Sequence, residues 1–498
     1  MVEVLAQITT KRSQDIATKG LSFGHTIPAH RIHPLTPPKL DSALIITEIK
    51  RASPSAGNIS EISSPIQLAQ SYLNGGSCAI SVLCEERHFH GSLADLMQVK
   101  NAYPHACVLR KDFIQDSKEI EISYRAGADM VLLIAAMFID EKQGFLQLQE
   151  IYKECLRFGI TPLLEVHTQR EIDFIAPLKP ALVGINARNL HTFEIDIPQA
   201  CVLRDSLPHS KVIFESGIHS AHCAFMVGSF GFDGLLCGSY LVAHENPTRA
   251  IQSLKHAFER GVKQKRRLYH HLFHKWHRLE IAIKICGITK LDNALHIAEL
   301  QGYGGVDMLG FILAQQSPRF IESTQLKHIA KALQSLYPHI LRIGVVNDKH
   351  SLHTAKMLYD EGYLDGIQLH GLPPQSPKIF ANTPLDDMLV CHYGVQNISS
   401  IDDFSPDYEG VFCLLDSKSA QGGGSGKSID THVLSALKET YLCIAGGISP
   451  HNLSSFLALK PAMLDINSGV EQSPGLKDIA LIQQILHRLS LNHNTKES

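Results

Sequence analysis

The sequence predicts an α/β protein made of two tandem (β/α)8 barrels that are joined by a helical linker. Short runs of apolar and β-branched residues, each followed by an amphipathic segment, occur eight times in each half of the chain. The length of 498 residues suits two barrels of about 250 residues each. Ionisable residues and small residues follow several of these runs, where barrels carry their active sites.

The predicted strands alternate with helices in both halves. In the first half they are expected near residues 44–50, 78–83, 106–110, 129–135, 160–166, 181–186, 211–215 and 233–238. In the second half they are expected near 281–286, 306–312, 341–346, 365–369, 388–392, 410–415, 441–445 and 462–466. An open doubly wound sheet would also alternate, but it usually has five or six strands and often a G-x-G-x-x-G turn. Neither half has that turn after its first strand, so two TIM barrels are favoured.

The domain boundaries follow from the strand positions. Residues 1–255 are predicted to form the first barrel and residues 281–498 the second. The segment 256–280 is dense in Lys, Arg and His and is predicted to be a basic linker helix. Four of its histidines have a spacing that could place them on a metal, namely His270, His271, His274 and His277. Because neither Cys nor Asp joins them, a solvated connecting helix is favoured and no metal site is predicted.

Composition restricts the class of partner. The formal net charge of −3 provides no basic field for nucleic acid or for an anionic membrane. The longest apolar run, at 130–139, is shorter than the roughly 20 residues of a membrane-spanning helix. The 11 cysteines include no C-x-x-C pair and suit reduced thiols. We therefore expect a cytoplasmic protein with small-molecule ligands.

Two opposite charges lie on the first predicted strand. Glu48 and Lys50, in ITEIKRASPS, are two residues apart and face the same side of the strand. We expect them in the mouth of the barrel, because a buried pair that only neutralises itself is a poor stabiliser. Ser53 and the turn after it offer a hydroxyl and backbone N–H groups that suit an anion.

A lysine and a glutamate mark two further strands. Lys111 follows the third strand in LRKDF, and Glu165 lies among Leu and Val in the fifth strand, TPLLEV. Burial raises the pKa of a carboxyl group and a nearby ammonium lowers it. The pair is therefore predicted to work as acid and base.

The last three strands of the first half end in residues that suit a carboxylate and a phosphate. Asn186 and Arg188, in GINARNL, are predicted to orient a planar carboxylate, Arg188 through its bidentate guanidinium. Small residues at loop-to-helix turns leave backbone N–H groups open to a phosphate, which barrels commonly bind after strands seven and eight. The candidates are Ser216, Gly217, Gly238 and Ser239.

These motifs together resemble a known enzyme family. EIKRASPS, SVLCEERHFHGS, VLRKDFI, LLEVH, GINARNL, ESGI and CGSYL closely resemble indole-3-glycerol-phosphate synthases over about residues 1–255. The resemblance implies closure of 1-(2-carboxyphenylamino)-1-deoxyribulose 5-phosphate to indole-3-glycerol phosphate, with loss of carbon dioxide and water. It implies that Lys111 is the general acid of ring closure and that Glu165 is the acid/base of dehydration. Glu48 and Lys50 would assist.

The same resemblance implies where the substrate lies. Lys50 and Ser53 would be near the phosphate. Asn186, counted with the catalytic residues, and Arg188 would face the anthranilate moiety. Phe89, in EERHFHG, would pack on an aromatic ring.

In the second half, a thiol and a carboxylate end two strands. Cys286, in KICGIT, precedes a turn into a helix, and we expect helix dipoles and a nearby cation to lower its pKa so that it acts as a base. The alternative, a buried structural role, fits the other ten cysteines better. Asp416, in FCLLDS, is predicted to face Cys286 across the barrel. Such a pair suits an aldose-to-ketose rearrangement.

Other residues of the second half suit binding. Arg319, in SPRF, is predicted to clamp a carboxylate, and His370, in QLHG, is either a ligand contact or a satisfied core histidine. The loop at 421–428 is not a P-loop, because Gln421 stands where that motif needs Gly. We expect this loop and two later turns to bind a phosphate, through Gly424, Gly426, Gly446, Gly447, Asn467 and Ser468.

KICGIT, SPRF, QLHG, LLDS, GGGSGK, AGGI and DINSGVE resemble phosphoribosylanthranilate isomerases over residues 281–490. The resemblance implies an Amadori rearrangement with Cys286 as general base and Asp416 as general acid, and with Arg319 on the anthranilate carboxylate. The product of this isomerase is the substrate of the synthase, so each resemblance supports the other.

Two alternatives are weaker. A pair of other phosphate-binding barrel isomerases would be expected to carry an aspartate after the first strand, where this chain has Glu48 and Cys286. A non-catalytic metabolite-binding scaffold would tolerate loss of the acid/base residues, and all of them are present. Neither reaction needs a cofactor or a metal, so none is expected. The partners expected are phosphorylated anthranilate substrates, and the oligomeric state is open, with a monomer plausible.

Overall fold

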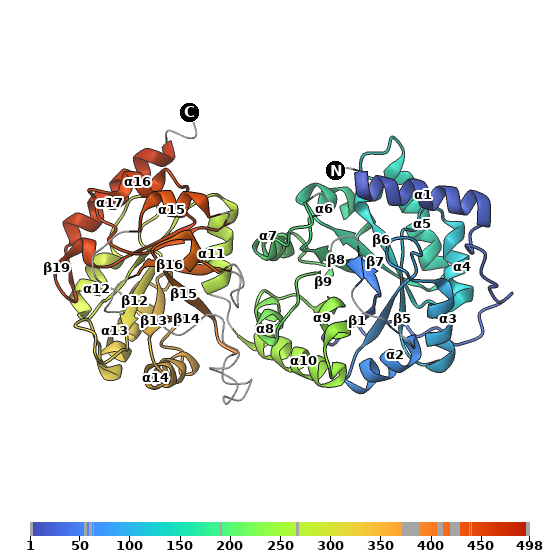
Figure 1. Cartoon of the computed structure of the whole chain (residues 1–498), viewed down its shortest axis with the longest axis horizontal. Coiled ribbons are helices and arrows are strands. Elements are labelled where there is room, and N and C mark those ends of the chain that lie inside the picture. Colours follow the sequence, from blue (N-terminus) through green and yellow to red (C-terminus); the bar gives the residue numbers. More distant parts are fainter. Residues whose placement is uncertain are drawn as a thin grey trace. The chain divides into compact units, whose positions relative to one another are not determined.

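The structure is a computed structural model that describes residues 3–53, 57–58, 62, 64–189, 192–264, 268–370, 389–405, 412–418, 429–437, 439 and 441–494. The chain divides into two compact units, Met1–Lys265 and Arg266–Ser498. Each unit contains a closed barrel of eight parallel strands (Figure 1). The predicted fold class, two tandem (β/α)8 barrels, is confirmed.

The first barrel has the strand order β1-β10-β9-β8-β7-β6-β5-β4. Its strands are β1 (Leu44–Ile49), β4 (Ala79–Leu83), β5 (Val108–Lys111), β6 (Met130–Ile134), β7 (Thr161–Val166), β8 (Leu182–Asn186), β9 (Lys211–Glu215) and β10 (Gly234–Cys237). They form because short, nearly continuous apolar runs can be buried on both faces. A small hairpin, β2 (Ala52–Ser53) with β3 (Gly57–Asn58), follows β1.

Helices surround this barrel (Figure 1). They are α1 (Glu3–Lys19), α2 (Pro65–Asn74), α3 (Leu93–Ala102), α4 (Lys118–Ala126), α5 (Gly144–Phe158), α6 (Gln169–Ile175), α7 (Ile197–Leu203), α8 (Ala221–Ser229), α9 (Ser239–Ala243) and α10 (Pro247–Lys263). Several begin where a Ser or Thr side chain accepts a hydrogen bond from the third helical N–H, as Ser92 and Thr168 do. Gly127 and Gly159 end α4 and α5 in the left-handed conformation.

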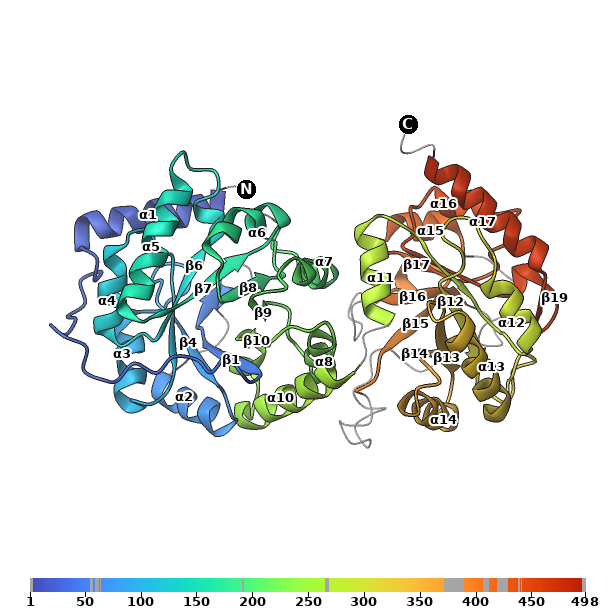
Figure 2. The ribbon, with the colours of Figure 1, turned by 180° about the vertical axis from the view of Figure 1, so that it is seen from behind.

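The second barrel has its strands in sequence order, from β11 to β18. They are β11 (Ala282–Ile285), β12 (Met308–Ile312), β13 (Leu341–Val346), β14 (Gly366–Leu369), β15 (His392–Ile398), β16 (Cys413–Ser417), β17 (Cys443–Ile444) and β18 (Met463–Ile466). Its described helices are α11 (Leu268–His277), α12 (Leu291–Ala298), α13 (Ser323–Leu336), α14 (Lys349–Asp360), α15 (Thr431–Ala436), α16 (Leu453–Leu457) and α17 (Ile479–Asn494), which Figure 2 shows from behind. A hairpin, β19 (Glu471–Ser473) with β20 (Leu476–Lys477), follows β18.

The predicted position of the fifth strand in the second barrel is wrong. The prediction of 388–392 followed the apolar residues there, but β15 begins at His392, which pairs with Ile367 of β14. The strand includes the polar residues His392 and Gln396, which are both buried. The side chain of Gln396 donates a hydrogen bond of 2.8 Å to the carbonyl of Ser405. A strand whose buried polar groups have partners does not stand out as an apolar run.

The segment 256–280 is not one solvated helix. It contains the end of α10 and the whole of α11, with residues 265–267 outside the described part of the chain. In α11, Leu268, Leu272 and Trp276 recur every fourth residue and are buried. This apolar stripe packs α11 on the second barrel, and the density of Lys, Arg and His in the sequence obscured it.

Polar contacts place α11 at the amino-terminal end of that barrel. The hydroxyl of Tyr269 donates to the carbonyl of His392 at 2.7 Å, and the indole of Trp276 donates to the carbonyl of Ala462 at 2.9 Å. Lys275 forms an ion pair of 2.8 Å with Asp307. These partners precede or begin β15, β18 and β12. The helix therefore covers the end of the barrel opposite to the carboxyl ends of its strands.

Within the described ranges of the chain, no helix combines the length and the apolar character that crossing a membrane requires.

Candidate active sites

A cavity of about 530 Å³ opens among the carboxyl ends of the strands of the first barrel. Its lining includes nearly all the residues predicted for this half, namely Glu48, Lys50, Phe89, Lys111, Glu165, Asn186, Arg188, Ser216, Gly217, Gly238 and Ser239. Ser53 lies in β2, and its side chain is outside the described part of the structure. The barrel topology thus brings together residues from all eight strands and from loops after them.

Lys111 lies between two carboxylates. Its ammonium donates to Glu165 Oε2 at 3.1 Å and to Glu215 Oε2 at 2.7 Å. Gly184 in β8 makes this possible, because a Cβ there would lie 2.1 Å from Glu215 Oε1. Glu215 ends β9 and was not among the predicted site residues, although its motif, FESGI, was singled out for the Ser and Gly that follow. A carboxylate at a strand end was the signal that could have identified it.

The environment separates the pKa values of these groups. Burial disfavours the ammonium of Lys111, but Glu215 and Glu165 outweigh it and hold the pKa of Lys111 above the ordinary value. Burial would also raise the pKa of Glu165, but Lys111 and His167 hold it well below its usual range. For Glu215, burial raises the pKa to about 7, although Lys111 opposes this, and the charge of Glu165 adds to it. The site therefore holds an ammonium, an ionised carboxylate and a carboxyl group that titrates near neutral pH.

Glu48 and Lys50 form an ion pair at the end of β1. Lys50 Nζ lies 3.2 Å from Glu48 Oε1, and the hydroxyl of Ser81 donates to Glu48 Oε2 at 3.2 Å. Gly238 has no side chain where Glu48 approaches, since a Cβ there would lie 2.9 Å from Glu48 Oε1. Both charged groups line the cavity, so each can face a ligand as well as its partner.

Apolar and aromatic groups line another part of the cavity. The rings of Phe89 and Phe113 have centroids 6.0 Å apart. The guanidinium of Arg188 donates to the carbonyl of Phe193 at 2.9 Å, which ties it to the loop after β8. Leu5 and Ile8 of α1 complete this part. An aromatic ring that carries a carboxylate would find both kinds of contact here.

The turn after β9 has an uncommon backbone. Ser216 and Gly217 are both in the left-handed region, with φ of 68° and 78°. A side chain on Gly217 would clash, because a Cβ there would lie 2.8 Å from Ile195 Cγ2. The turn after β10 brings Gly238 and Ser239 to the same cavity. Such turns can aim backbone N–H groups at an anion.

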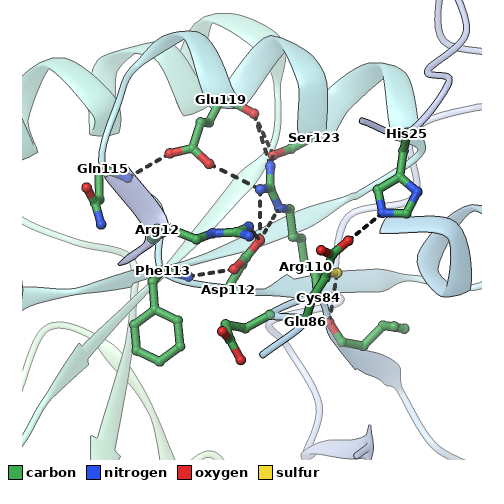
Figure 3. Close-up of polar contacts among 12 residues, drawn as sticks. Arg12, His25, Cys84, Glu86, Arg110, Asp112, Phe113, Gln115, Glu119 and Ser123 are labelled. Carbon is green, nitrogen blue, oxygen red and sulfur yellow. Dashed lines mark hydrogen bonds and ion pairs between the residues drawn. The ribbon is translucent and has the colours of Figure 1, made fainter. Parts of the chain in front are cut away.

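The residues on either side of Lys111 in the sequence, Arg110 and Asp112, belong to a buried charge network (Figure 3). Arg12 of α1 and Arg110 of β5 both bind Oδ2 of Asp112, and Arg110 does so at 2.8 Å. Arg110 also pairs with Glu119 at 3.2 Å. Because Asp112 directly follows Lys111, this network fixes the backbone that carries the ammonium.

In the second barrel, Cys286 lies beside a buried ion pair. Lys284 Nζ donates to Asp465 Oδ2 at 2.7 Å and to Gln368 Oε1 at 2.6 Å. Gly310 of β12 gives the sulfur its space, since a Cβ there would lie 2.8 Å from Cys286 Sγ. Sequence reasoning missed Lys284 and Asp465, which are the first residues of the motifs KICGIT and DINSGVE. Both are buried in the barrel.

The expected low pKa of Cys286 is wrong for this structure. Burial raises the pKa of the thiol, and Lys284 and Lys477 offset only part of that effect. The prediction considered the helix dipole and a cation but not the loss of solvent, because the extent of burial was unknown from the sequence.

Asp416 is also buried, near the end of β16. Burial raises the pKa of its carboxyl group, although His370 and the backbone N–H of Ser417 oppose this. Nε2 of His370 lies 3.8 Å from Asp416 Oδ2. Lys284 and Asp465 act electrostatically on both Asp416 and Cys286. The thiol and the carboxyl group thus share one charged neighbourhood.

Arg319 is held by a carboxylate of the chain itself. Its Nε and Nη2 donate to Glu471 of the β19–β20 hairpin at 2.9 and 2.7 Å. Lys477 of the same hairpin donates to Glu471 at 2.6 Å and to the side chain of Asn467 at 2.7 Å. Gly287 lies against this group, because a Cβ there would be 2.8 Å from Asn467 and 2.9 Å from Arg319. Arg319, which was predicted to clamp a carboxylate, is therefore next to the turn after Cys286 and already pairs with Glu471.

The remaining predicted residues of this half lie in turns. Gly446 and Gly447, after β17, have φ of 92° and 60°, which favours glycine at both positions. Ser468 begins a single 3-10 turn after Asn467. Gly424 and Gly426 lie outside the described residues.

The comparisons with known proteins assign each barrel to a family. Residues 33–254 match the family model of indole-3-glycerol phosphate synthase, and residues 283–488 match that of N-(5'-phosphoribosyl)anthranilate isomerase. An indole-3-glycerol phosphate synthase of Micrococcus luteus is 41% identical over 43% of this chain and 78% of its own length. The chain belongs to both families.

Relatives that match both halves of the chain are named as proteins of tryptophan biosynthesis. The tryptophan biosynthesis protein TrpCF of Helicobacter pylori is 29% identical over 88% of each chain. A multifunctional tryptophan biosynthesis protein of Schizosaccharomyces pombe is 30% identical over 97% of this chain, which spans 66% of that protein's length. The predicted family, a synthase fused to an isomerase of tryptophan biosynthesis, is confirmed.

Proposed function

We propose that the chain is a bifunctional enzyme of tryptophan biosynthesis. The second barrel isomerises N-(5-phosphoribosyl)anthranilate, and the first barrel converts the product to indole-3-glycerol phosphate. The observation that carries this proposal is the position of Lys111 in a cavity of about 530 Å³. Its ammonium lies 3.1 Å from Glu165 Oε2 and 2.7 Å from Glu215 Oε2. An acid and a base whose pKa values are pushed apart suit a reaction that needs both proton donation and proton removal.

In the synthase reaction, the anthranilate ring carbon attacks the carbonyl carbon of the ribulose chain. Lys111 donates a proton to the carbonyl oxygen as the carbon–carbon bond forms, and loss of carbon dioxide restores the aromatic ring. Glu165 then serves as the acid/base of dehydration, in which the new hydroxyl group leaves as water. Glu48 and Lys50, which line the same cavity, assist.

The same cavity has distinct regions for the two ends of this substrate. Ser216, Gly217, Gly238 and Ser239 bind the phosphate. Phe89 packs on the aromatic ring, and Asn186 and Arg188 orient the anthranilate carboxylate. Lys50 and Ser53 lie toward the phosphate. This assignment is supported by the apolar and aromatic groups on one part of the lining and the left-handed turn on another.

In the isomerase reaction, Asp416 donates a proton to the ring oxygen of the ribose, and the ring opens to an imine. Cys286 removes a proton from the adjacent carbon, which yields the enolamine and then the ketose. The raised pKa of Asp416 favours its protonated form, which a general acid requires. Arg319 holds the anthranilate carboxylate, and His370 contacts the ligand. The phosphate lies at Gly424, Gly426, Gly446, Gly447, Asn467 and Ser468.

The decisive experiment supplies the purified protein with phosphoribosylanthranilate, without added metal, and follows its fluorescence while indole-3-glycerol phosphate is quantified. We expect the indole product to appear. Accumulation of the ribulose intermediate would contradict the synthase assignment, and persistence of the starting material would contradict the isomerase assignment.

We also propose that the enzyme works in the cytoplasm on these phosphorylated small molecules. All 11 cysteines are free thiols, which suits a reducing compartment. Fractionation of cells that express the chain, with immunodetection in each fraction, tests this location.

A further inference from the structure

His167 is a buried titratable side chain that the proposed reaction does not use. It follows Glu165 by two residues at the end of β7, so both side chains face the same side. Its Nε2 lies 3.3 Å from Glu165 Oε1, whereas Lys111 holds Oε2 of the same carboxylate at 3.1 Å. The side chain is only 7% exposed and is not part of the cavity lining. His167 therefore contacts Glu165 from behind.

A second carboxylate holds the other side of the imidazole. Nδ1 of His167 lies 3.1 Å from Glu171 Oε2, and the backbone N–H of His167 donates to the same oxygen at 2.9 Å. Glu171 is fixed in turn by the hydroxyl of Thr168 at 3.0 Å, in the first turn of α6. Each ring nitrogen thus faces a carboxylate oxygen, and only the imidazolium carries a proton on both.

We propose that His167 is a positioning residue of the synthase, which holds Glu165 ionised through a Glu171–His167–Glu165 chain. This inference rests on the proposed synthase activity. Among the described residues, Nε2 of His167 has no aligned hydrogen-bond partner, and its contact with Glu165 is an ion pair. His167 therefore acts on Glu165 through its charge. Among the described residues, Lys111 is the other cation that pairs with Glu165, and Lys111 also pairs with Glu215.

The electrostatics of the surrounding elements support this role. Burial disfavours the imidazolium, but Glu165 and Glu171 raise the pKa of His167 to about 9. The groups that act on Glu165 include Lys111 from β5, His167 after β7 and the carboxyl group of Glu215 from β9. The amide of Asn186 from β8 also donates to Oε1 at 3.2 Å. An imidazolium that persists through neutral pH frees Lys111 to lose and regain its proton while Glu165 keeps its charge.

The kinetic test compares His167→Gln with His209→Gln, a histidine variant at an exposed position. We expect His167→Gln to lower the kcat of the synthase about tenfold on the acidic limb of its pH profile, where Glu165 becomes protonated, with KM changed less than twofold, because Glu165 loses about one pKa unit of stabilisation of its charged form. The acidic limb of the kcat profile should move up by about one pH unit. His209→Gln should behave as wild type, and Glu171→Gln should show a smaller shift in the same direction.

A spectroscopic test does not depend on turnover. In protein labelled at histidine Cε1, the NMR signal that disappears in His167→Gln should titrate near pH 9 in the wild type. In Glu165→Gln it should titrate at least about one unit lower, since one charged partner is gone. The same signal can be identified by its displaced titration in Glu165→Gln, so the measurement on the folded wild type decides the question even if His167→Gln does not fold.

A pKa of about 6.5 for His167, the ordinary value, would overturn the inference. An unchanged pH profile of the synthase in folded His167→Gln would also overturn it. If the wild type closes no indole ring while the His167 signal titrates near pH 9, the proposed function fails and the charge chain stands.

Discussion

At the scale of single residues, burial and neighbouring charges shift the pKa values of the candidate acid and base groups in both barrels. In the first barrel, Lys111 lies between Glu165 and Glu215, which share one ammonium, and burial leaves one carboxyl group with a pKa of about 7. In the second, burial raises the pKa of both Cys286 and Asp416. The first site thus supplies its own ionised base, whereas the second needs its thiol to be deprotonated.

We expect single substitutions to remove one activity and leave the other. Cys286→Ala or Asp416→Asn should lower the isomerase rate by about 10²–10⁴-fold, because each removes a general acid or base. Lys111→Ala or Glu165→Gln should do the same to the synthase. Separate assays with each barrel's own substrate check this, and the untouched activity is the control. Parallel loss of both activities in a folded variant would contradict independent sites.

Lys284 is expected to govern the ionisation of Cys286. Because the thiol must lose its proton to act as a base and Lys284 favours the thiolate, Lys284→Met should raise its pKa further. The rising limb of the pH profile of the isomerase kcat/KM should move up by about one pH unit. At pH values below this limb, kcat/KM should be about tenfold lower than in the wild type. Lys349→Met removes a charge from an exposed position and should change neither.

Since Lys284→Met leaves the carboxylate of Asp465 buried without its cation, the double variant with Asp465→Asn provides a second test. Because Asp465 itself raises the pKa of Cys286, the folded double variant should shift the limb less than Lys284→Met alone. A folded Lys284→Met variant with the wild-type pH profile would contradict this role.

At the scale of elements, α11 belongs to the core of its barrel. Burial of Leu272 and Trp276 predicts that Leu272→Ala or Trp276→Ala lowers the free energy of unfolding by about 2–5 kcal/mol, through lost transfer energy and a cavity. Urea unfolding followed by the isomerase activity checks both variants. His277→Ala on the exposed face of the same helix should stay within about 0.5 kcal/mol of wild type. Equal effects at both faces would contradict the packing described above.

Elements also differ in how well the sequence predicts them. The strands of the first barrel lie where their apolar runs are, because each is buried on both faces and few polar residues interrupt them. For β15 the same rule failed, since His392 and Gln396 are buried with hydrogen-bond partners that come from other parts of the chain. Long-range partners cannot be inferred from a local pattern.

At the scale of the whole molecule, we expect the two units to fold separately. Fragments 1–265 and 266–498 should each retain the activity of their own barrel, because each contains a closed sheet and its own core. A shorter fragment, 281–498, lacks α11 and should be destabilised or unfolded. Circular dichroism melting and the two assays distinguish these outcomes. Loss of activity in both longer fragments, with recovery on mixing, would show that the barrels depend on each other.

The sequence by itself determined the two barrels and their families, and it predicted the acid/base residues of each site. Repeated apolar runs specify buried parallel strands, and motifs such as VLRKDFI and KICGIT keep reacting groups at strand ends.

Only the tertiary structure decided which charges face one another. Glu215, His167, Lys284 and Asp465 gain their roles from neighbours on other strands, and the pKa of Cys286 depends on how completely the fold excludes water. Electrostatic interaction and desolvation both depend on distances in space, which separation along the chain does not specify.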